Sequence, residues 1–106
     1  MSATFHPAVI SEDKLFWRYT EGEHPNFSNS NARMILEELG LSSNFEETPA
    51  ALNRIDDIIY RCETAYDYHI SHDGGEGNPY IVSALERIQA AMEEGKEKGA
   101  THWYCA

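Results

Sequence analysis

Apolar and polar residues alternate along the first part of the chain, as they do in half-buried β-strands. Segment 4–22 alternates on both sides of a polar Ser-Glu-Asp-Lys turn, which predicts a hairpin. Leu15, Trp17 and Tyr19 would lie on one face of its second strand. Segment 21–31 is polar and lacks this alternation, so we expect a loop there.

Apolar residues then recur at intervals of three and four, which predicts three helices. The first is expected from about Ser30 to Leu39, with Gly40 ending it. The third should begin after the Asn-Pro pair at positions 78 and 79 and continue to about Lys98. Its predicted buried stripe consists of Ile81, Leu85, Ile88 and Met92.

The second predicted helix begins with a Thr-Pro pair, in which Thr48 would cap the first turn. The helical period continues to about Tyr68. Its apolar positions are spaced to share one face and are expected to contact the core: Leu52, Ile55, Ile59, Cys62 and Tyr66.

Segment 101–106 predicts a short strand close to the end of the chain. Side chains alternate along a strand, so Trp103 and Cys105 would be buried while His102 and Tyr104 face solvent. The N-terminal hairpin and this strand would form a small sheet covered by the three helices. The prediction is therefore one α+β domain over residues 1–106, and an all-α three-helix domain is the alternative.

The charge of the chain indicates more about its binding partners than its overall composition does. The chain has 8 Lys and Arg against 18 Asp and Glu, a net charge of −10. Residues 1–33 carry −1 and residues 87–106 are balanced, so −9 lies in residues 34–86. Such a surface repels phosphate backbones, so direct binding to nucleic acid is not expected. It would instead attract a basic protein surface.

The second predicted helix carries a polar stripe beside its apolar face. A polar stripe of this kind is more often only a solvated helix face. Here, however, the stripe lies in the part of the chain that carries most of the negative charge. A tyrosine within it would supply the kind of aromatic contact that is enriched in protein interfaces. The predicted partner-binding residues are Asn53, Asp56, Tyr60, Glu63 and Asp67.

These observations favour a small non-enzymatic interaction protein that binds a basic surface of a protein partner. In size and charge it resembles small acidic proteins of phages, some of which act as inhibitors of nucleic-acid-binding proteins. Self-association into a homo-oligomer through exposed aromatic residues is a further possibility.

A different class of function, small-ligand binding, is suggested at the start of the first predicted helix. Free backbone N–H groups and the helix dipole favour an anion there, such as the phosphate of a nucleotide. Helix capping alone is the commoner reason for such a cluster. The candidate ligand-binding residues are Ser28, Asn29, Ser30, Asn31 and Arg33.

A metal is the other ligand considered. His69 and His72 have the spacing of a zinc-binding pair and precede a glycine-rich segment, which predicts that they lie in a loop. His102 and Cys105 have the same spacing, but residues three apart on a strand point to opposite faces. A zinc site is therefore the weaker reading, and no cofactor is expected.

The chain carries no nucleophile motif and no phosphate-binding glycine-rich loop, so no catalytic residues are predicted. Two cysteines are too few for a disulfide scaffold. No apolar run is long enough to span a membrane, and the N-terminal residues lack the pattern of a signal peptide. We therefore expect a cytoplasmic protein that does not bind membranes.

Overall fold

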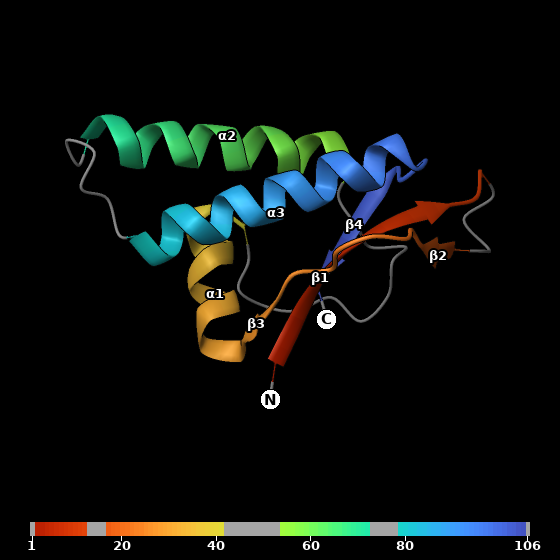
Figure 1. Cartoon of the computed structure of the whole chain (residues 1–106), viewed down its shortest axis with the longest axis horizontal. Coiled ribbons are helices and arrows are strands. Elements are labelled where there is room, and N and C mark those ends of the chain that lie inside the picture. Colours follow the sequence, from red (N-terminus) through yellow and green to blue (C-terminus); the bar gives the residue numbers. More distant parts are fainter. Residues whose placement is uncertain (1, 13–16, 42–53, 73–78, 106) are drawn as a thin grey trace.

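The computed structural model describes residues 2–12, 17–41, 54–72 and 79–105, and it has the α+β architecture predicted from the sequence (Figure 1). Three helices and four strands follow one another within these residues. In chain order they are β1 (Ser2–Ile10), β2 (Trp17–Tyr19), β3 (Asn26–Ser28), α1 (Asn29–Glu38), α2 (Ile55–His72), α3 (Pro79–Glu97) and β4 (His102–Cys105).

Strand β1 is the centre of an antiparallel sheet. Ala8 pairs with Tyr19 of β2 and also with His102 of β4, so these strands lie on opposite sides of β1. The predicted pairing of an N-terminal hairpin with a C-terminal strand is thereby confirmed. Residues 13–16, which include part of the predicted turn and Leu15, lie outside the described residues.

Strand β3 corrects the prediction of a loop over residues 21–31. It pairs with the beginning of β1, where Ala3 lies opposite Phe27. Between β2 and β3 the chain stays beside β1, because Thr20 N–H donates to the Pro7 carbonyl and Phe5 N–H donates to the Pro25 carbonyl. A strand of three residues is too short to give a recognisable alternation.

Local signals set both ends of α1. The Ser28 hydroxyl accepts a hydrogen bond from the backbone N–H of Asn31 at 3.3 Å, which caps the first turn. At the other end, Gly40 has φ = 73°. Gly40 N–H donates to the Glu37 carbonyl and Leu41 N–H to the Leu36 carbonyl, which is a Schellman motif. The predicted helix end at Gly40 is confirmed.

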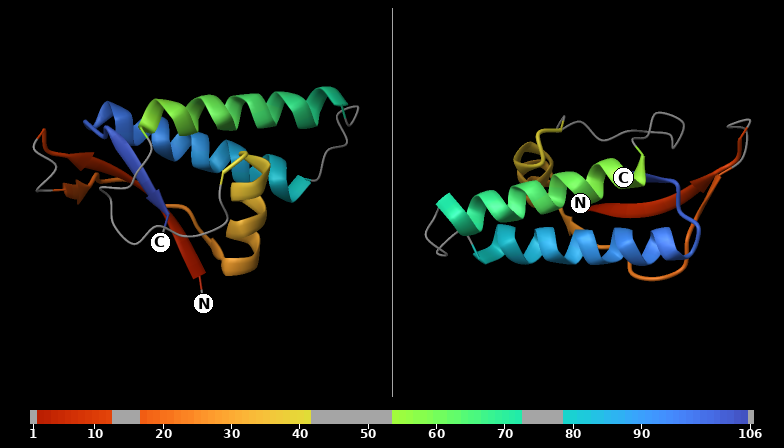
Figure 2. Two further views of the ribbon diagram at one scale, coloured as in Figure 1. Left: turned by 180° about the vertical axis from the view of Figure 1, so that it is seen from behind. Right: turned by 90° about the horizontal axis from the view of Figure 1, so that it is seen from above.

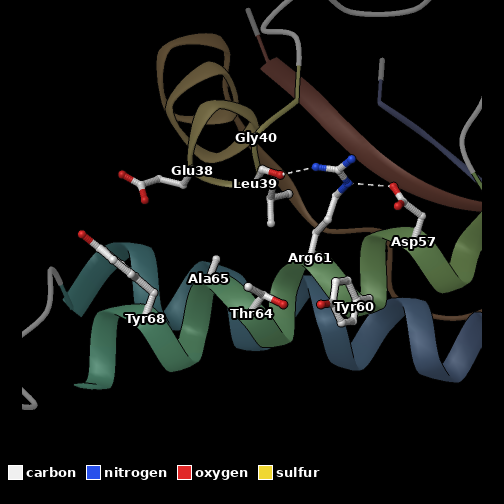
Figure 3. Close-up of a pocket in the computed structure, with 9 residues that line it drawn as sticks. All are labelled: Glu38, Leu39, Gly40, Asp57, Tyr60, Arg61, Thr64, Ala65 and Tyr68. Atoms are coloured by element: carbon white, nitrogen blue, oxygen red, sulfur yellow. Dashed lines mark hydrogen bonds and ion pairs between the residues drawn. The ribbon is translucent and has the colours of Figure 1, made fainter. Parts of the chain in front are cut away.

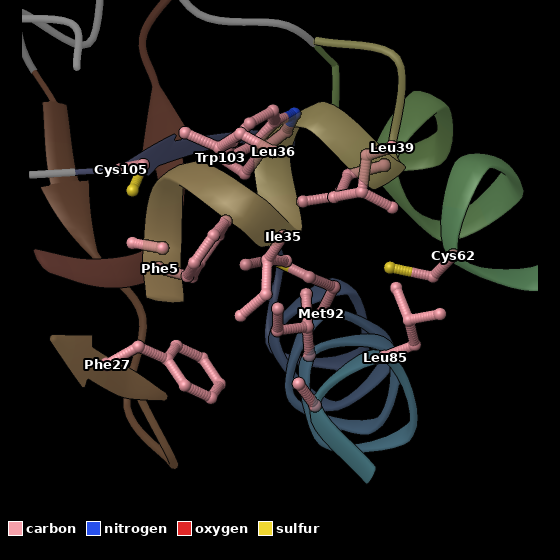
Figure 4. Packing of buried hydrophobic residues seen from close by; sticks show 14 of the residues in the cluster. Phe5, Phe27, Ile35, Leu36, Leu39, Cys62, Leu85, Met92, Trp103 and Cys105 are labelled. Atoms are coloured by element: carbon pink, nitrogen blue, oxygen red, sulfur yellow. The ribbon is translucent and has the colours of Figure 1, made fainter. Parts of the chain in front are cut away.

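Helices α2 and α3 lie side by side and antiparallel, with the sheet against α3 (Figures 1 and 2). The predicted stripe of α3 is confirmed: Ile81, Leu85, Ile88 and Met92 are all buried. The buried side chains of the helices meet those of β1, β3 and β4 in one cluster (Figure 4). Within it, the Phe5 ring meets the Phe27 ring edge-on, with centroids 5.8 Å apart.

The buried face of α2 is rotated relative to the prediction. Ile55 and Cys62 are buried as expected, but Ile58 replaces Ile59 in the core. Ile59 and Tyr66 are only partly buried. The buried face is a stripe spaced by three and four residues, made of Ile55, Ile58, Cys62, Ala65 and His69. The predicted Thr48 cap and Leu52 lie outside the described residues.

Strand β4 buries both of its faces. Trp103 and Cys105 are buried as predicted, and the Trp103 ring stacks on Phe5 with centroids 6.0 Å apart. The prediction that Tyr104 faces solvent is wrong, because it is only 7% exposed. Its ring packs with those of His6 and Tyr19 on the opposite sheet face, at centroid distances of 6.1 and 6.3 Å.

Gly95 lets α3 approach the sheet closely. A Cβ atom at this position would lie 2.4 Å from Cβ and 2.8 Å from Cγ of Pro7, and 3.2 Å from Oγ1 of Thr20. Pro7 belongs to the central strand and is fully buried, so it has little room to shift. The absence of a side chain at Gly95 is therefore a packing requirement.

We predict that Gly95→Ala lowers the free energy of unfolding by about 1–3 kcal/mol, because an overpacked methyl group displaces Pro7 or α3. In an exposed helix the same change would stabilise the protein by about 1 kcal/mol. Urea unfolding followed by circular dichroism measures the difference. Ser83→Ala, at an exposed position of α3, is the control and should leave the stability nearly unchanged. An unchanged or raised stability in Gly95→Ala would contradict this account of the packing.

Candidate interaction surface

The predicted partner-binding residues of α2 are exposed, but they do not form one patch. Asp56, Tyr60, Glu63 and Asp67 all lie at exposed positions, while Asn53 lies outside the described residues. Asp56, Glu63 and Asp67 border α3, whereas Tyr60 lines a groove on the side of α1. The structure thus divides the predicted stripe between two flanks of one helix.

The flank toward α3 is acidic. A groove of about 400 Å³ between the helices is lined by Glu63, Tyr66, Asp67, Glu86 and Gln89. The Gln89 amide donates to Glu63 at 3.2 Å and to Glu93 at 3.3 Å, so it links the two helices. A hydrogen bond from Tyr66 to Glu86 and the charge of that carboxylate raise the pKa of the Tyr66 hydroxyl.

Lys96 is a basic residue of α3 that borders this flank. Its Nζ lies 2.5 Å from Asp56 Oδ1, which gives Asp56 a cationic partner that the sequence of α2 did not suggest. None of the described residues forms an ion pair with Glu63, Glu86 or Glu93. The acidic flank, defined as Asp56, Glu63 and Asp67 of α2 with Glu86, Glu93 and Glu97 of α3, is therefore strongly negative.

The opposite flank of α2 is more apolar and forms a groove with the end of α1 (Figure 3). Its volume is about 490 Å³. Tyr60 and Tyr68 are 67% and 56% exposed. The residues lining this α1–α2 groove are Glu38, Leu39, Gly40, Asp57, Tyr60, Arg61, Thr64, Ala65 and Tyr68.

Arg61 joins the two sides of the α1–α2 groove. Its Nε donates to Asp57 Oδ2 at 2.8 Å, and its Nη1 donates to the Leu39 carbonyl at 2.9 Å (Figure 3). The second bond satisfies a carbonyl at the C-terminus of α1, where a cation is also favoured by the helix dipole. The Arg61 guanidinium thus binds two groups of the protein itself, one on α2 and one at the end of α1.

His69 is not in a loop, as the sequence suggested, but in the helix α2, of which His72 is the last residue. The His69 side chain is 11% exposed, and its Nε2 lies 2.8 Å from Glu38 Oε2, so it joins α2 to α1. Among the described residues, no three His, Cys, Asp or Glu side chains are grouped as a metal site requires. His69 therefore has a structural partner, and zinc binding stays a weak prediction.

The predicted ligand residues are together at the N-terminus of α1. Ser28 caps the helix, and Ser30 and Arg33 occupy exposed positions of its first turns. The Oδ1 atom of Asn29 is enclosed and has no hydrogen-bond partner. Capping accounts for Ser28 through its bond to Asn31, and anion binding by this cluster stays a prediction.

A cluster of histidine and tyrosine rings, which was not predicted from the sequence, covers the face of the sheet that carries Tyr104. His6 stacks on Tyr19 with centroids 4.0 Å apart, and its Nδ1 lies 2.7 Å from Nδ1 of His24. His24 Nε2 donates to the Thr20 carbonyl at 2.7 Å. In the neutral pair, His24 Nδ1 is therefore the acceptor and His6 Nδ1–H the donor.

The two cysteines are buried as free thiols. Burial raises the pKa of the Cys62 thiol to about 12, and the charges of Glu63 and Glu93 add to the effect. Burial alone raises the pKa of the Cys105 thiol to about 12. Both side chains are therefore uncharged at neutral pH, and a thiol is a poor nucleophile in that form.

Comparison with known proteins identifies no relative: no family model, curated protein or solved structure matches the chain. Among the helices that the structure describes, none combines the length and apolar character needed to cross a bilayer.

We predict that His6 makes the protein less stable as the pH falls from about 6.5 to about 4. Burial, followed by the charge of His24, lowers the pKa of His6 from 6.5 to about 4. Between these values the unfolded chain binds a proton that the folded state does not, so the free energy of unfolding decreases with falling pH. Thermal unfolding of the wild type and His6→Phe, measured across this range, tests the effect.

The phenylalanine ring preserves stacking on Tyr19 but cannot titrate. The stability of His6→Phe should fall less steeply between pH 6.5 and 4, the window that the lowered pKa defines. Above the ordinary pKa of histidine, the two proteins should show parallel pH dependences. Equal slopes of the two curves within the window would rule out His6 as the titrating group.

Proposed function

We propose that this protein is a non-enzymatic cytoplasmic interaction protein that binds a basic surface of a protein partner through its acidic flank. The observation that carries this proposal is the charge of that flank. Six carboxylates from two packed helices form it, and among the described residues only Asp56 of these six has an ion-pair partner, Lys96.

The arrangement of the carboxylates suits an extended basic surface. Asp56, Glu63 and Asp67 follow one another along α2 at intervals of seven and four residues, and Glu86, Glu93 and Glu97 repeat those intervals along α3. Such intervals separate neighbouring carboxylates by about 10 and 6 Å along each helix axis. A partner with several lysines or arginines can therefore approach more than one carboxylate at once.

The binding mechanism would begin with electrostatic steering. A dense group of like charges raises the rate at which an oppositely charged partner is encountered, and salt weakens this effect. Exposed ion pairs add little affinity individually, so contacts of short range must hold the complex. Tyr60, on the opposite flank of α2, is exposed enough to contribute one.

The partner class that fits best is a nucleic-acid-binding protein. Its phosphate-binding surface is basic, and an acidic protein that occupies this surface would inhibit nucleic-acid binding, as some small phage proteins do. The uncharged, buried thiols of Cys62 and Cys105 argue against a cysteine nucleophile in this protein. A second copy of this chain is a less suitable partner, because two acidic flanks repel each other.

We predict that the double substitution Glu63→Gln/Glu86→Gln weakens partner binding roughly two- to thirtyfold, since each removed charge loses about 0.2–1 kcal/mol of interaction. The partner is first captured from host extract with wild-type protein and then purified. Its affinity for the wild type and the variant is measured by calorimetry at roughly 0.05 M and 0.5 M salt.

The matched control is Glu12→Gln/Glu37→Gln, which removes the same charge from exposed positions outside the acidic flank. This control should bind almost as the wild type does. Duplex DNA should compete with the wild-type protein for the purified partner. An affinity that is insensitive to both salt and the flank substitutions would refute the proposed function.

A further inference from the structure

We propose that the α1–α2 groove is a docking site for a short segment of the basic partner, in which a large apolar side chain is flanked by lysine or arginine. This inference rests on the proposed function and adds a second, apolar contact to it. Large parts of the groove wall are carbon atoms, and tyrosine is among the residues that contribute most to protein interfaces.

The shape of the groove follows from the order of residues along α2. Tyr60, Thr64 and Tyr68 are four residues apart, so they lie in one row on the helix surface. The two tyrosines are about 12 Å apart along the axis, with the smaller Thr64 between them. Ala65 and Leu39 are both buried, at 9% and 4% exposure, and form the floor. A notch of this form accepts one large apolar side chain.

Charge complementarity favours a basic flank on the incoming segment. Glu38 and Asp57 are carboxylates of the groove wall, and beside their present partners, His69 and Arg61, their side chains remain 39% and 40% exposed. The acidic flank adds further negative charge on the other side of α2. The groove's own cation, Arg61, is already bound to Asp57 and to the Leu39 carbonyl. An added arginine or lysine would meet carboxylates and the negative faces of exposed tyrosine rings, with which cations interact favourably.

The probe is a display library of random peptides of about twelve residues, long enough to cross the groove as a helix or as a strand. We expect the enriched peptides to combine a large apolar residue with lysine or arginine nearby in sequence. The affinity of a synthetic peptide from this selection is then measured by fluorescence anisotropy with the wild type and the variants below.

Thr64→Trp fills the notch between the two tyrosines without changing a buried position, because Thr64 is exposed. It should weaken peptide binding at least about tenfold, as expected when a central contact of an interface is lost. Ser83→Trp places the same side chain at an exposed position of α3 and should leave the affinity unchanged. Tyr60→Ser removes one wall, and should weaken binding even if the larger Thr64→Trp variant were misfolded.

Three results would overturn the inference: no enrichment, enrichment of acidic peptides, or equal binding by wild type, Thr64→Trp and Tyr60→Ser. A dimer that forms at high concentration and is lost in Thr64→Trp would also overturn it, in favour of a second copy as occupant. If the groove variants bind the purified partner normally while Glu63→Gln/Glu86→Gln does not, the groove is not a docking site but the proposed function stands. If neither the groove variants nor Glu63→Gln/Glu86→Gln weaken binding to the purified partner, both the docking site and the proposed function are refuted.

Discussion

Helix α3 contacts α2, the central strand β1 and α1, and the positions of these elements depend on that shared contact. Its buried positions include both large and small residues. The small ones allow close approach, most clearly at Gly95, where the Pro7 ring occupies the space of a side chain. Because one helix is packed on more than one side, three of its exposed carboxylates, Glu86, Glu93 and Glu97, lie in a narrow strip beside α2.

Features encoded by neighbouring residues were predictable from the sequence, and those decided by tertiary packing were not. The cap at Ser28, the glycine end of α1 and the stripe of α3 depend on local chemistry or on a clear period. In α2, however, Ile58 and Ile59 are adjacent and equally apolar, so only the position of the packed elements determines which is buried. Tyr104 illustrates the same limit, since a sheet with two covered faces does not show simple alternation.

The interaction surface shows a similar division. The concentration of acidic charge is a property of the sequence, and the exposed acids of α2 were predicted from it. The contacts of α2 with other elements were not predicted from the sequence. Lys96 and Gln89, which bind Asp56 and Glu63, come from α3, and Arg61 of α2 reaches the end of α1. Tyr60 and Glu63 are three residues apart on one helix, yet they face different neighbours. One helix can therefore supply charge on one flank and apolar contact on the other.

The two buried thiols have a consequence for how the fold can be observed. Cys62 lies in α2 and Cys105 in β4, so each reports on a different part of the core. A thiol reagent reaches them only when the surrounding structure opens, because neither side chain is accessible or ionised in the folded state. Their rates of alkylation under native conditions therefore measure the free energies of opening at two sites. Equal rates would show that the helical layer and the sheet open together, and unequal rates would show which one opens first.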